Sequence, residues 1–166
     1  MSSPDSTLTW LKSWATREFG PTYANEIAEI RANYSTLTGR RKYELLTPQT
    51  YSLLNYNEAD DVLAEWKTIV DSAQSIYNKL DAAAKPSFFQ LVMHPAAAGY
   101  VVNQVHINAG RNNMYAVEFR TSANTIAQKV LDLFKQDHSL QQQYDSLLNG
   151  KWKHFMDQTH YGYNWL

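Results

Sequence analysis

Three groups of polar side chains are the first candidates for chemistry in this sequence. In the first, Arg40, Arg41 and Lys42 place three cations in a row directly after Gly39. Such a run either lies in a solvated loop or holds one arginine in a bidentate contact with a carboxylate, because the planar guanidinium matches that group. The carboxylate would belong to this domain or to a neighbouring one. We therefore treat Arg40, Arg41 and Lys42 as candidate interface or sugar-contact residues.

The second group is a polar run with helical spacing, which is able to line a contact surface. Its members carry amide or cationic side chains: Gln104, Asn108, Arg111, Asn112 and Asn113. Within it, Arg111 and Asn112 are the candidate contact residues. Arg120 raises the same question more weakly.

The third group lies near the end of the chain. Asp157 and His160 are three residues apart, the spacing of an acid/base pair or of two metal ligands. No third ligand lies nearby in the sequence, so capping of the last helix is the better interpretation. The aromatic end, with Tyr161 and Trp165, is the kind of segment that packs on something, and we treat His160, Tyr161 and Trp165 as candidate contact residues.

The remaining histidines and acids predict no catalytic or metal centre. The five histidines form no zinc-binding motif, and His94 and His106 are expected to be hydrogen-bonded structural residues. Asp60, Asp61 and Glu65 fall near the start of a predicted helix, where acids are favoured by the helix dipole and face water. No spacing indicates a pair of glycosidase carboxylates, and no nucleophile elbow, phosphate-binding loop or dinucleotide motif is present. The sequence therefore predicts no catalytic residue, no metal and no cofactor.

Composition fits one globular domain that spans residues 1–166. The chain has six Phe, five Trp and eleven Tyr, enough to build a real core. Its formal charge of −1 gives no support for nucleic-acid binding, and the absence of cysteine excludes disulfides and thiolate metal sites. No apolar run approaches the roughly 18 residues that a transmembrane helix needs, so we expect no membrane partner. The first six residues lack the features of a signal peptide.

Helical spacing of apolar residues predicts the first half of the fold. A first helix is expected to begin at Ser3-Pro4 and to end at Gly20-Pro21, and a second to stop at a left-handed Gly39. An irregular connector, about 39–56, follows, with a short helical turn at Thr47-Pro48. Asn57 is expected to cap a third helix, with Asp60 completing a capping box. That helix has the cleanest period: Ala59, Val62, Trp66, Ile69, Ala73, Ile76 and Leu80.

The second half reads as further helices with weaker boundaries. A helix from about 84 must break or kink at Pro95, because proline clashes with the preceding turn. Residues 110–113 are either a turn or a weak point in a long helix. A further helix is expected to carry Tyr115 and Phe119 through Leu133, and the last helical stretches include 152–156. No strand pattern occurs. The prediction is an all-α, five- to six-helix up-and-down bundle, with an irregular connector and an irregular aromatic C-terminal tail.

A series of short motifs carries a resemblance to a known family. In order, they are Arg17–Pro21, Gly39–Lys42, Glu44–Pro48, Thr50–Tyr56, Glu58–Asp60, Gln90–Pro95, Ala109–Asn112, Gly150–Trp152 and Met156–His160. Together they resemble the helical-bundle domain of glycoside hydrolase family 115, the xylan α-1,2-glucuronidases, across essentially the whole chain. The resemblance implies that the catalytic and glucuronate-binding residues lie on a separate TIM barrel, so no residue here inherits a catalytic role and the chain alone is not expected to be active.

The resemblance also implies partners for the chain. In the family the bundle packs beside the catalytic barrel and takes part in dimer contacts, so we expect the barrel and possibly a second copy as partners, and glucuronoxylan only through the parent enzyme. The chain would begin at the first helix of the bundle and stop before a following β-sandwich. Full-length relatives are expected to be secreted or periplasmic. The alternatives are a freestanding carbohydrate-binding or protein-interaction module, and a self-associating structural bundle.

Overall fold

The computed structural model describes residues 4–161, and helices dominate it. The long ones are α1 (Pro4–Phe19), α2 (Ala24–Arg40), α3 (Glu58–Lys79), α5 (His94–Val117) and α6 (Ser122–Asp145). The short ones are the 3₁₀ turn η1 (Tyr43–Leu45), α4 (Lys85–Phe88), the π-helical turn η2 (Phe89–Met93) and α7 (Leu147–Gly150). Since no strand occurs among the described residues, the predicted all-α class is confirmed.

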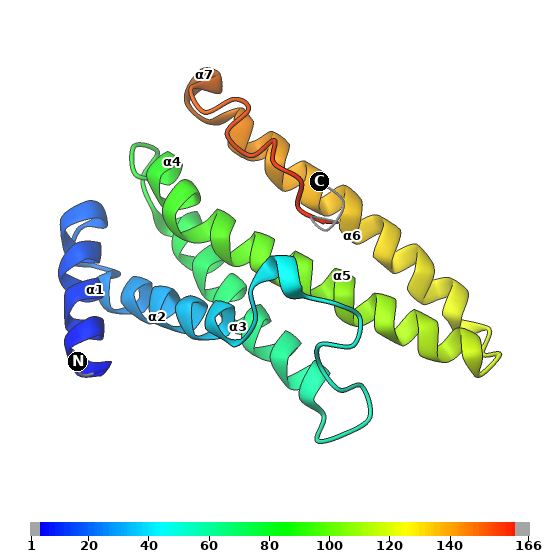
Figure 1. Ribbon diagram of the computed structural model, residues 1–166. Helices are drawn as coiled ribbons and strands as arrows, with labels where there is room; N and C mark the ends of the chain where they lie inside the picture. Colours follow the sequence, from blue (N-terminus) through cyan, green and yellow to red (C-terminus); the bar gives the residue numbers. More distant parts are fainter. Residues whose placement is uncertain (1–3, 162–166) are drawn as a thin grey trace.

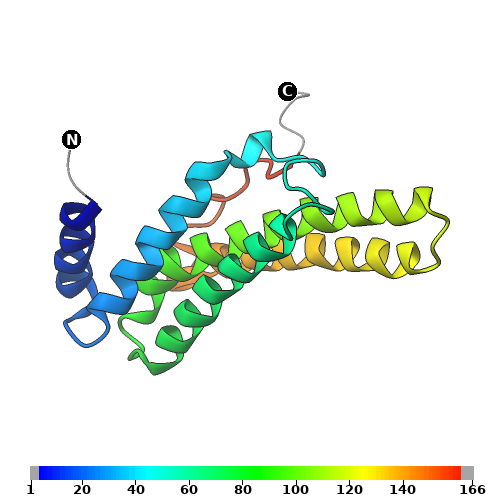
Figure 2. The same cartoon turned by 90° about the horizontal axis from the view of Figure 1, so that it is seen from below.

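α5 runs through the middle of the molecule, with α3 and α6 packed against it. α5 and α6 form an antiparallel hairpin that extends beyond the other helices (Figure 2). α3 packs on α5, α2 packs on α3 and contacts η2, and α1 crosses the start of α2 (Figure 1). After α7, the chain runs back beside α6 as far as Tyr161 (Figure 1). This return segment has no helix, and the irregular C-terminal tail predicted from His160 onward is confirmed for its described residues, 160 and 161.

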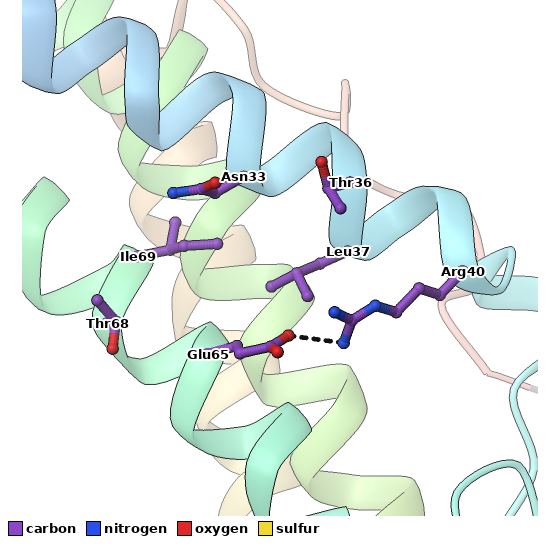
Figure 3. Close-up of a pocket in the computed structure, with 7 residues that line it drawn as sticks. All are labelled: Asn33, Thr36, Leu37, Arg40, Glu65, Thr68 and Ile69. Carbon is purple, nitrogen blue, oxygen red and sulfur yellow. Dashed lines mark ion pairs between the residues drawn. The ribbon is translucent and has the colours of Figure 1, made fainter. Parts of the chain in front are cut away.

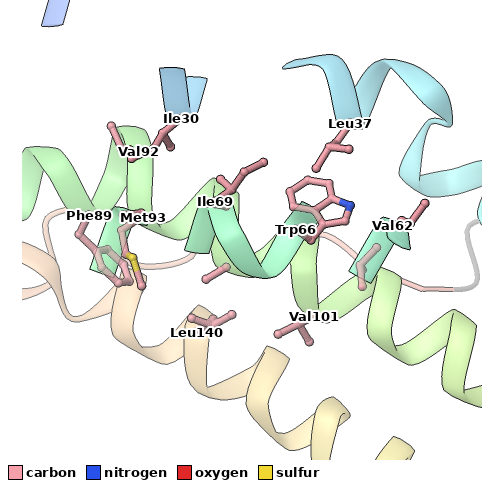
Figure 4. Packing of buried hydrophobic residues seen from close by; sticks show 14 of the residues in the cluster. Ile30, Leu37, Val62, Trp66, Ile69, Phe89, Val92, Met93, Val101 and Leu140 are labelled. Atoms are coloured by element: carbon pink, nitrogen blue, oxygen red, sulfur yellow. The ribbon is translucent and has the colours of Figure 1, made fainter. Parts of the chain in front are cut away.

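The core is centred on the buried face of α3. Its predicted positions from Ala59 to Ile76 are all buried, and Leu80 is half-buried. Trp66, only 1% exposed, lies in the middle of the cluster (Figure 4) and meets the ring of Tyr34 edge-on at 5.9 Å. Burial of one such large apolar side chain contributes about 2–3 kcal/mol. The fit requires Gly99 on α5, because a Cβ there would lie 2.4 Å from the Trp66 ring.

Of the break or kink expected at Pro95, the break does not occur, because the helical run continues through this residue. The backbone N–H of His94 donates to the carbonyl of Phe89, five residues back, so the chain makes one π-helical turn before α5. Proline has no N–H for the carbonyl of Leu91, four residues before it. Arg31 of α2 supplies the missing donor, with its Nη1 3.2 Å from the Leu91 oxygen. A neighbouring helix thus satisfies the group that proline leaves open.

Several predicted boundaries were wrong as well. Gly39 lies inside α2, and the helix ends because Arg41 turns extended. The short helical turn of the connector is Tyr43–Leu45, and Thr47-Pro48 forms a plain turn. Asn57 precedes α3 in the left-handed region, with φ 57°, and makes no capping hydrogen bond; its side chain donates to Asp61 instead. The predicted capping box is therefore not formed.

The turn between the last two long helices also lies elsewhere. α5 runs straight through residues 110–113, which is the helical one of the two alternatives, and the reversal comes at 118–121. Phe119, placed on a helix by its spacing, stands in this turn with φ 56° and is 95% exposed. Residues 152–156 form turns after α7 in place of the expected helix.

Candidate functional site

Arg40 closes α2 and forms an ion pair across the α2–α3 seam. Its Nη1 lies 2.6 Å from Oε2 of Glu65 on α3, and the two side chains are 39% and 47% exposed (Figure 3). Such half-exposed pairs contribute about 0–1 kcal/mol. Arg40 is therefore neither free in a solvated loop nor buried: it bridges two helices over a hollow of about 340 Å³ that Leu37 and Ile69 line from below.

This hollow belongs to a groove along the whole seam between α2 and α3, which we call the α2–α3 groove. Hollows of about 490 and 420 Å³ continue it at the two ends and share Ile69 and Arg40, respectively, with the central one. Six acidic side chains are among its lining residues: Glu26, Glu29, Glu58, Asp61, Glu65 and Asp71. Arg40 and Lys79 are the lining cations. The groove is thus an open, negatively charged surface in a chain whose net charge is only −1.

The other two cations of the run point to different surroundings. The Nε of Arg41 donates to the carbonyl of Leu45 at 3.1 Å, which holds the start of the connector in its 3₁₀ turn. Lys42 is exposed. The structure therefore separates the three adjacent residues: one bridges α2 and α3, one folds the connector, and one faces outward.

Arg111 joins α5 to the start of α3, next to the point where the connector crosses α5. Its Nη2 contacts Oδ1 of Asp60 at the start of α3, and its side chain is 20% exposed against 60% for the acid. One residue earlier, Gly110 lies directly under the connector, and a Cβ there would come 2.4 Å from the carbonyl oxygen of Pro48. Asn112, next to this joint, is half-buried. The close approach at Gly110 positions the connector on α5. Asp60 and Glu65 face water, as expected, but each forms an ion pair, with Arg111 and Arg40, respectively.

A second cavity, of about 180 Å³, lies between the start of α5, the middle of α6 and the return segment; we call it the histidine pocket. Its polar lining residues are Tyr43, His94, Asp137 and His160, and its apolar ones are Ala98, Val102 and Met156. His160 Nδ1 donates to Oδ2 of Asp137 at 2.7 Å, and Nε2 donates to the Met156 carbonyl at 3.3 Å. The pair ties the return segment to α6.

The two histidines of the pocket differ in charge preference. Burial, reinforced by the charge of nearby His160 and opposed by Asp137, lowers the pKa of His94 from 6.5 to about 4. The hydrogen bond to Asp137 raises the pKa of His160, although partial burial opposes it. Near neutral pH, His94 is therefore neutral beside an Asp137–His160 pair.

His94 is buried, but the expected hydrogen bond is absent among residues 4–161. It instead meets the Tyr144 ring at 4.9 Å and the Phe89 ring at 5.8 Å. His106 likewise makes a ring contact, with Tyr161 at 6.0 Å, where a hydrogen bond was expected. The hydroxyl of Tyr43 is also buried without a hydrogen-bond partner in the described part of the chain.

The candidates near the chain end have separate roles. Asp157 accepts from His154 and from Gln141, and His160 binds Asp137, so Asp157 and His160 neither pair nor cap a helix. Tyr161 packs on Phe134, with ring centroids 4.7 Å apart. Burial, with the nearby charge of Asp137, raises the pKa of the Tyr161 hydroxyl. Trp165 lies outside the described residues.

Sequence reasoning missed the histidine pocket, because its members come from four distant segments. Only the adjacency of His94 to Pro95 hinted at an unusual backbone there. Within residues 4–161 no group of three His, Asp or Glu side chains is arranged to hold a metal ion. In the same part of the chain, every helix is too short or too polar to cross a membrane.

The fold and these sites define an all-α helical bundle with an acidic surface groove and one small histidine-lined pocket. The family model of glycosyl hydrolase family 115 matches residues 1–45, which contain α1, α2 and η1. A search of curated proteins gave no match. The chain is thus similar to this family over residues 1–45, which include Arg40, Arg41 and Lys42.

Proposed function

We propose that this chain is a helical support and assembly domain, or a fragment, of a xylan α-1,2-(4-O-methyl)glucuronidase of family 115, without the catalytic barrel. The observation that carries the proposal is the family match over residues 1–45, which includes the helix bearing the Arg40–Glu65 bridge. The all-α fold of the described residues agrees with the bundle domain that the sequence resembles.

The proposed contact with a catalytic barrel uses the outer surface around the end of α2. There, Lys42 is exposed and the α2–α3 groove offers carboxylates to a partner. Surface charges of this kind set the register and the association rate of an interface more than its affinity. A second copy of the chain is a further proposed partner. Glucuronoxylan would be reached only through the parent enzyme.

Two measurements test this proposal. Incubation of the purified chain with glucuronoxylan should release no (methyl)glucuronic acid, and release by the chain alone would contradict the support role. A family 115 catalytic barrel expressed without its own bundle should form a complex with the chain, measured by sedimentation velocity. Lys42→Glu should slow that association, whereas Lys129→Glu, on the distant α6, should leave it unchanged. If the barrel and the wild-type chain form no complex, the proposal is also contradicted.

The alternative, a freestanding carbohydrate-binding module, has one observation in its favour. Tyr56 and Phe119 are 97% and 95% exposed, both with φ 56°, and Trp10 is 63% exposed. Exposed aromatic faces are suited to stacking on sugar rings. Affinity electrophoresis in a gel containing glucuronoxylan separates the two functions: a support domain migrates unretarded, whereas a sugar-binding module is retarded and loses the retardation when Tyr56 and Phe119 are replaced by serine.

A further inference from the structure

The histidine pocket has the dimensions of a site for one small molecule. Its volume of about 180 Å³ slightly exceeds that of an engineered protein cavity of about 150 Å³ that binds benzene. Ala98, Val102 and Met156 form an apolar wall. The rings of Tyr43, His94 and His160 and the carboxylate of Asp137 form the rest. Aromatic walls favour an aromatic guest, because ring faces and edges attract each other.

Two polar groups of the pocket lack a hydrogen-bond partner among the described residues: the imidazole of His94 and the buried hydroxyl of Tyr43. His94 is 8% exposed, and a buried polar group without a hydrogen bond is costly, so such groups normally find one. A neutral imidazole offers one nitrogen acceptor and one N–H donor. His94 is neutral at pH 7, since burial lowers its pKa to about 4. A hydroxyl group in the cavity is able to donate to the acceptor nitrogen or to accept from the N–H.

The charges of the pocket select an uncharged guest. Asp137 and His160 neutralise each other, and both ring nitrogens of His160 already have acceptors. An added ion would have to be desolvated without a free counter-charge, which is unfavourable in a mostly apolar cavity.

The backbone conformation just before His94 is a second observation that supports a binding site here. The π-helical turn η2 ends at Met93, immediately before His94, and Gln90 within it donates to the Tyr144 hydroxyl on α6 at 2.7 Å. Single π-turns inside helices occur frequently at functional sites, because they re-aim the residues that follow.

We propose that the histidine pocket binds a small, uncharged hydroxyaromatic compound, with its ring against the wall of Ala98, Val102 and Met156 and its hydroxyl hydrogen-bonded to His94. This binding site is independent of the support function and of the α2–α3 groove. The outcome of the binding experiment therefore neither supports nor contradicts the proposed support function, which is tested separately.

The Met156 methyl group is the reporter of choice, because it lines the cavity. Phenol is titrated into the full chain carrying ¹³C-methyl methionine, and the Met156 signal is assigned with Met156→Leu. We expect a saturable shift with a dissociation constant on the order of 1 mM or tighter. Toluene, which lacks the hydroxyl, should bind about 3- to 10-fold more weakly, the effect of one neutral hydrogen bond. Cyclohexanol, which lacks the aromatic ring, should also bind more weakly.

Two variants and two matched controls decide the result. Ala98→Leu fills the cavity and should abolish the saturable shift, whereas Ala64→Leu on the exposed side of α3 should not. His94→Phe keeps a ring but removes the nitrogens, so it should abolish the preference for phenol over toluene, whereas exposed His138→Phe should keep it. Circular dichroism verifies that each variant is folded. If Ala98→Leu is unfolded, the preference of His94→Phe for phenol over toluene still tests the proposal. No saturable shift below about 10 mM, a shift that persists in folded Ala98→Leu, or equal affinity for phenol and toluene would overturn the proposal.

Discussion

Replacing His94 by phenylalanine is expected to remove most of the acid sensitivity that this pocket gives the protein. Five groups face the imidazole: Tyr43 from the connector, Phe89 from η2, Asp137 and Tyr144 from α6, and His160 from the return segment. Asp137 supplies the only negative charge among them, and it is already paired with His160. Protonated His94 would therefore lie buried without a counter-charge of its own, which explains why its pKa falls to about 4.

The sign of the effect follows from proton linkage. Between about pH 6.5 and pH 4 the unfolded chain carries a proton on His94 and the folded protein does not. The stability that neutral His94 maintains is therefore present above pH 6.5 and is lost as the pH falls towards 4. A pKa lowered from 6.5 to about 4 corresponds to about 3 kcal/mol, at about 1.4 kcal/mol per pH unit. About 2 kcal/mol of this should be lost between pH 7 and pH 4.5.

Urea unfolding at pH 7 and at pH 4.5, followed by circular dichroism, measures this loss. The wild-type protein should lose about 2 kcal/mol more than His94→Phe on acidification, whatever the stability of the variant at pH 7. The control is His138→Gln, which changes an exposed histidine on α6 and should behave as the wild type. The reasoning is refuted if His94→Phe and the wild type lose the same free energy of unfolding between the two pH values.

Three further predictions concern packing and ion pairs. Gly99→Ala should lower the free energy of unfolding by about 1–3 kcal/mol, because the new methyl group meets the Trp66 ring. Gly39→Ala has open space within α2 and should raise the free energy of unfolding by up to about 1 kcal/mol, and chemical denaturation compares the two variants. His160→Gln should lower the melting temperature at pH 6 and have little effect at pH 9. The pKa of His160 is raised in the folded protein, so its ion pair with Asp137 stabilises the fold below pH 6.5, and this stabilisation is lost as the pH rises through the pKa of the folded state. An unchanged melting temperature at pH 6 would contradict this. Arg111→Met and Asp60→Asn should each cost up to about 1 kcal/mol and be non-additive in a double-mutant cycle. Full additivity would show that the pair does not stabilise the contact between α5 and the start of α3.

The fold class and the main buried face follow from local sequence alone. The regular spacing from Ala59 to Ile76 predicts one face of α3, and every one of these positions is buried. Gly20 likewise ends α1 in the left-handed region, with φ 81°, as a glycine after a helix predicts. These features depend on neighbours in the sequence, so the spacing of residue types is enough to find them.

The wrong boundaries arose where a local signal has a cause elsewhere in the fold. Gly110 is typical of a turn, but it is required because the Pro48 carbonyl passes over α5 at that point. Gly39 stays helical, and Phe119, an apolar residue with helical spacing, forms the turn. The conformation at such positions depends on a distant segment or on the reversal of the chain, so the periodicity of apolar residues could not predict it. The histidine pocket shares this origin, since four distant segments assemble it.

The first two turns of α5 show why such residues cluster. Pro95 removes a backbone donor, the π-turn and Arg31 compensate for it, and the same turn delivers His94 into the pocket. Gly99, one turn later, admits Trp66 on a neighbouring face. Each of these residues departs from what an isolated helix prefers, and each departure is matched by a contact with another element. The pocket is thus built into the most constrained part of the bundle, whereas the α2–α3 groove lies on its open surface. Changes to the exposed carboxylates of the groove should therefore alter association with little effect on stability, whereas changes around His94 should alter both ligand binding and the free energy of unfolding.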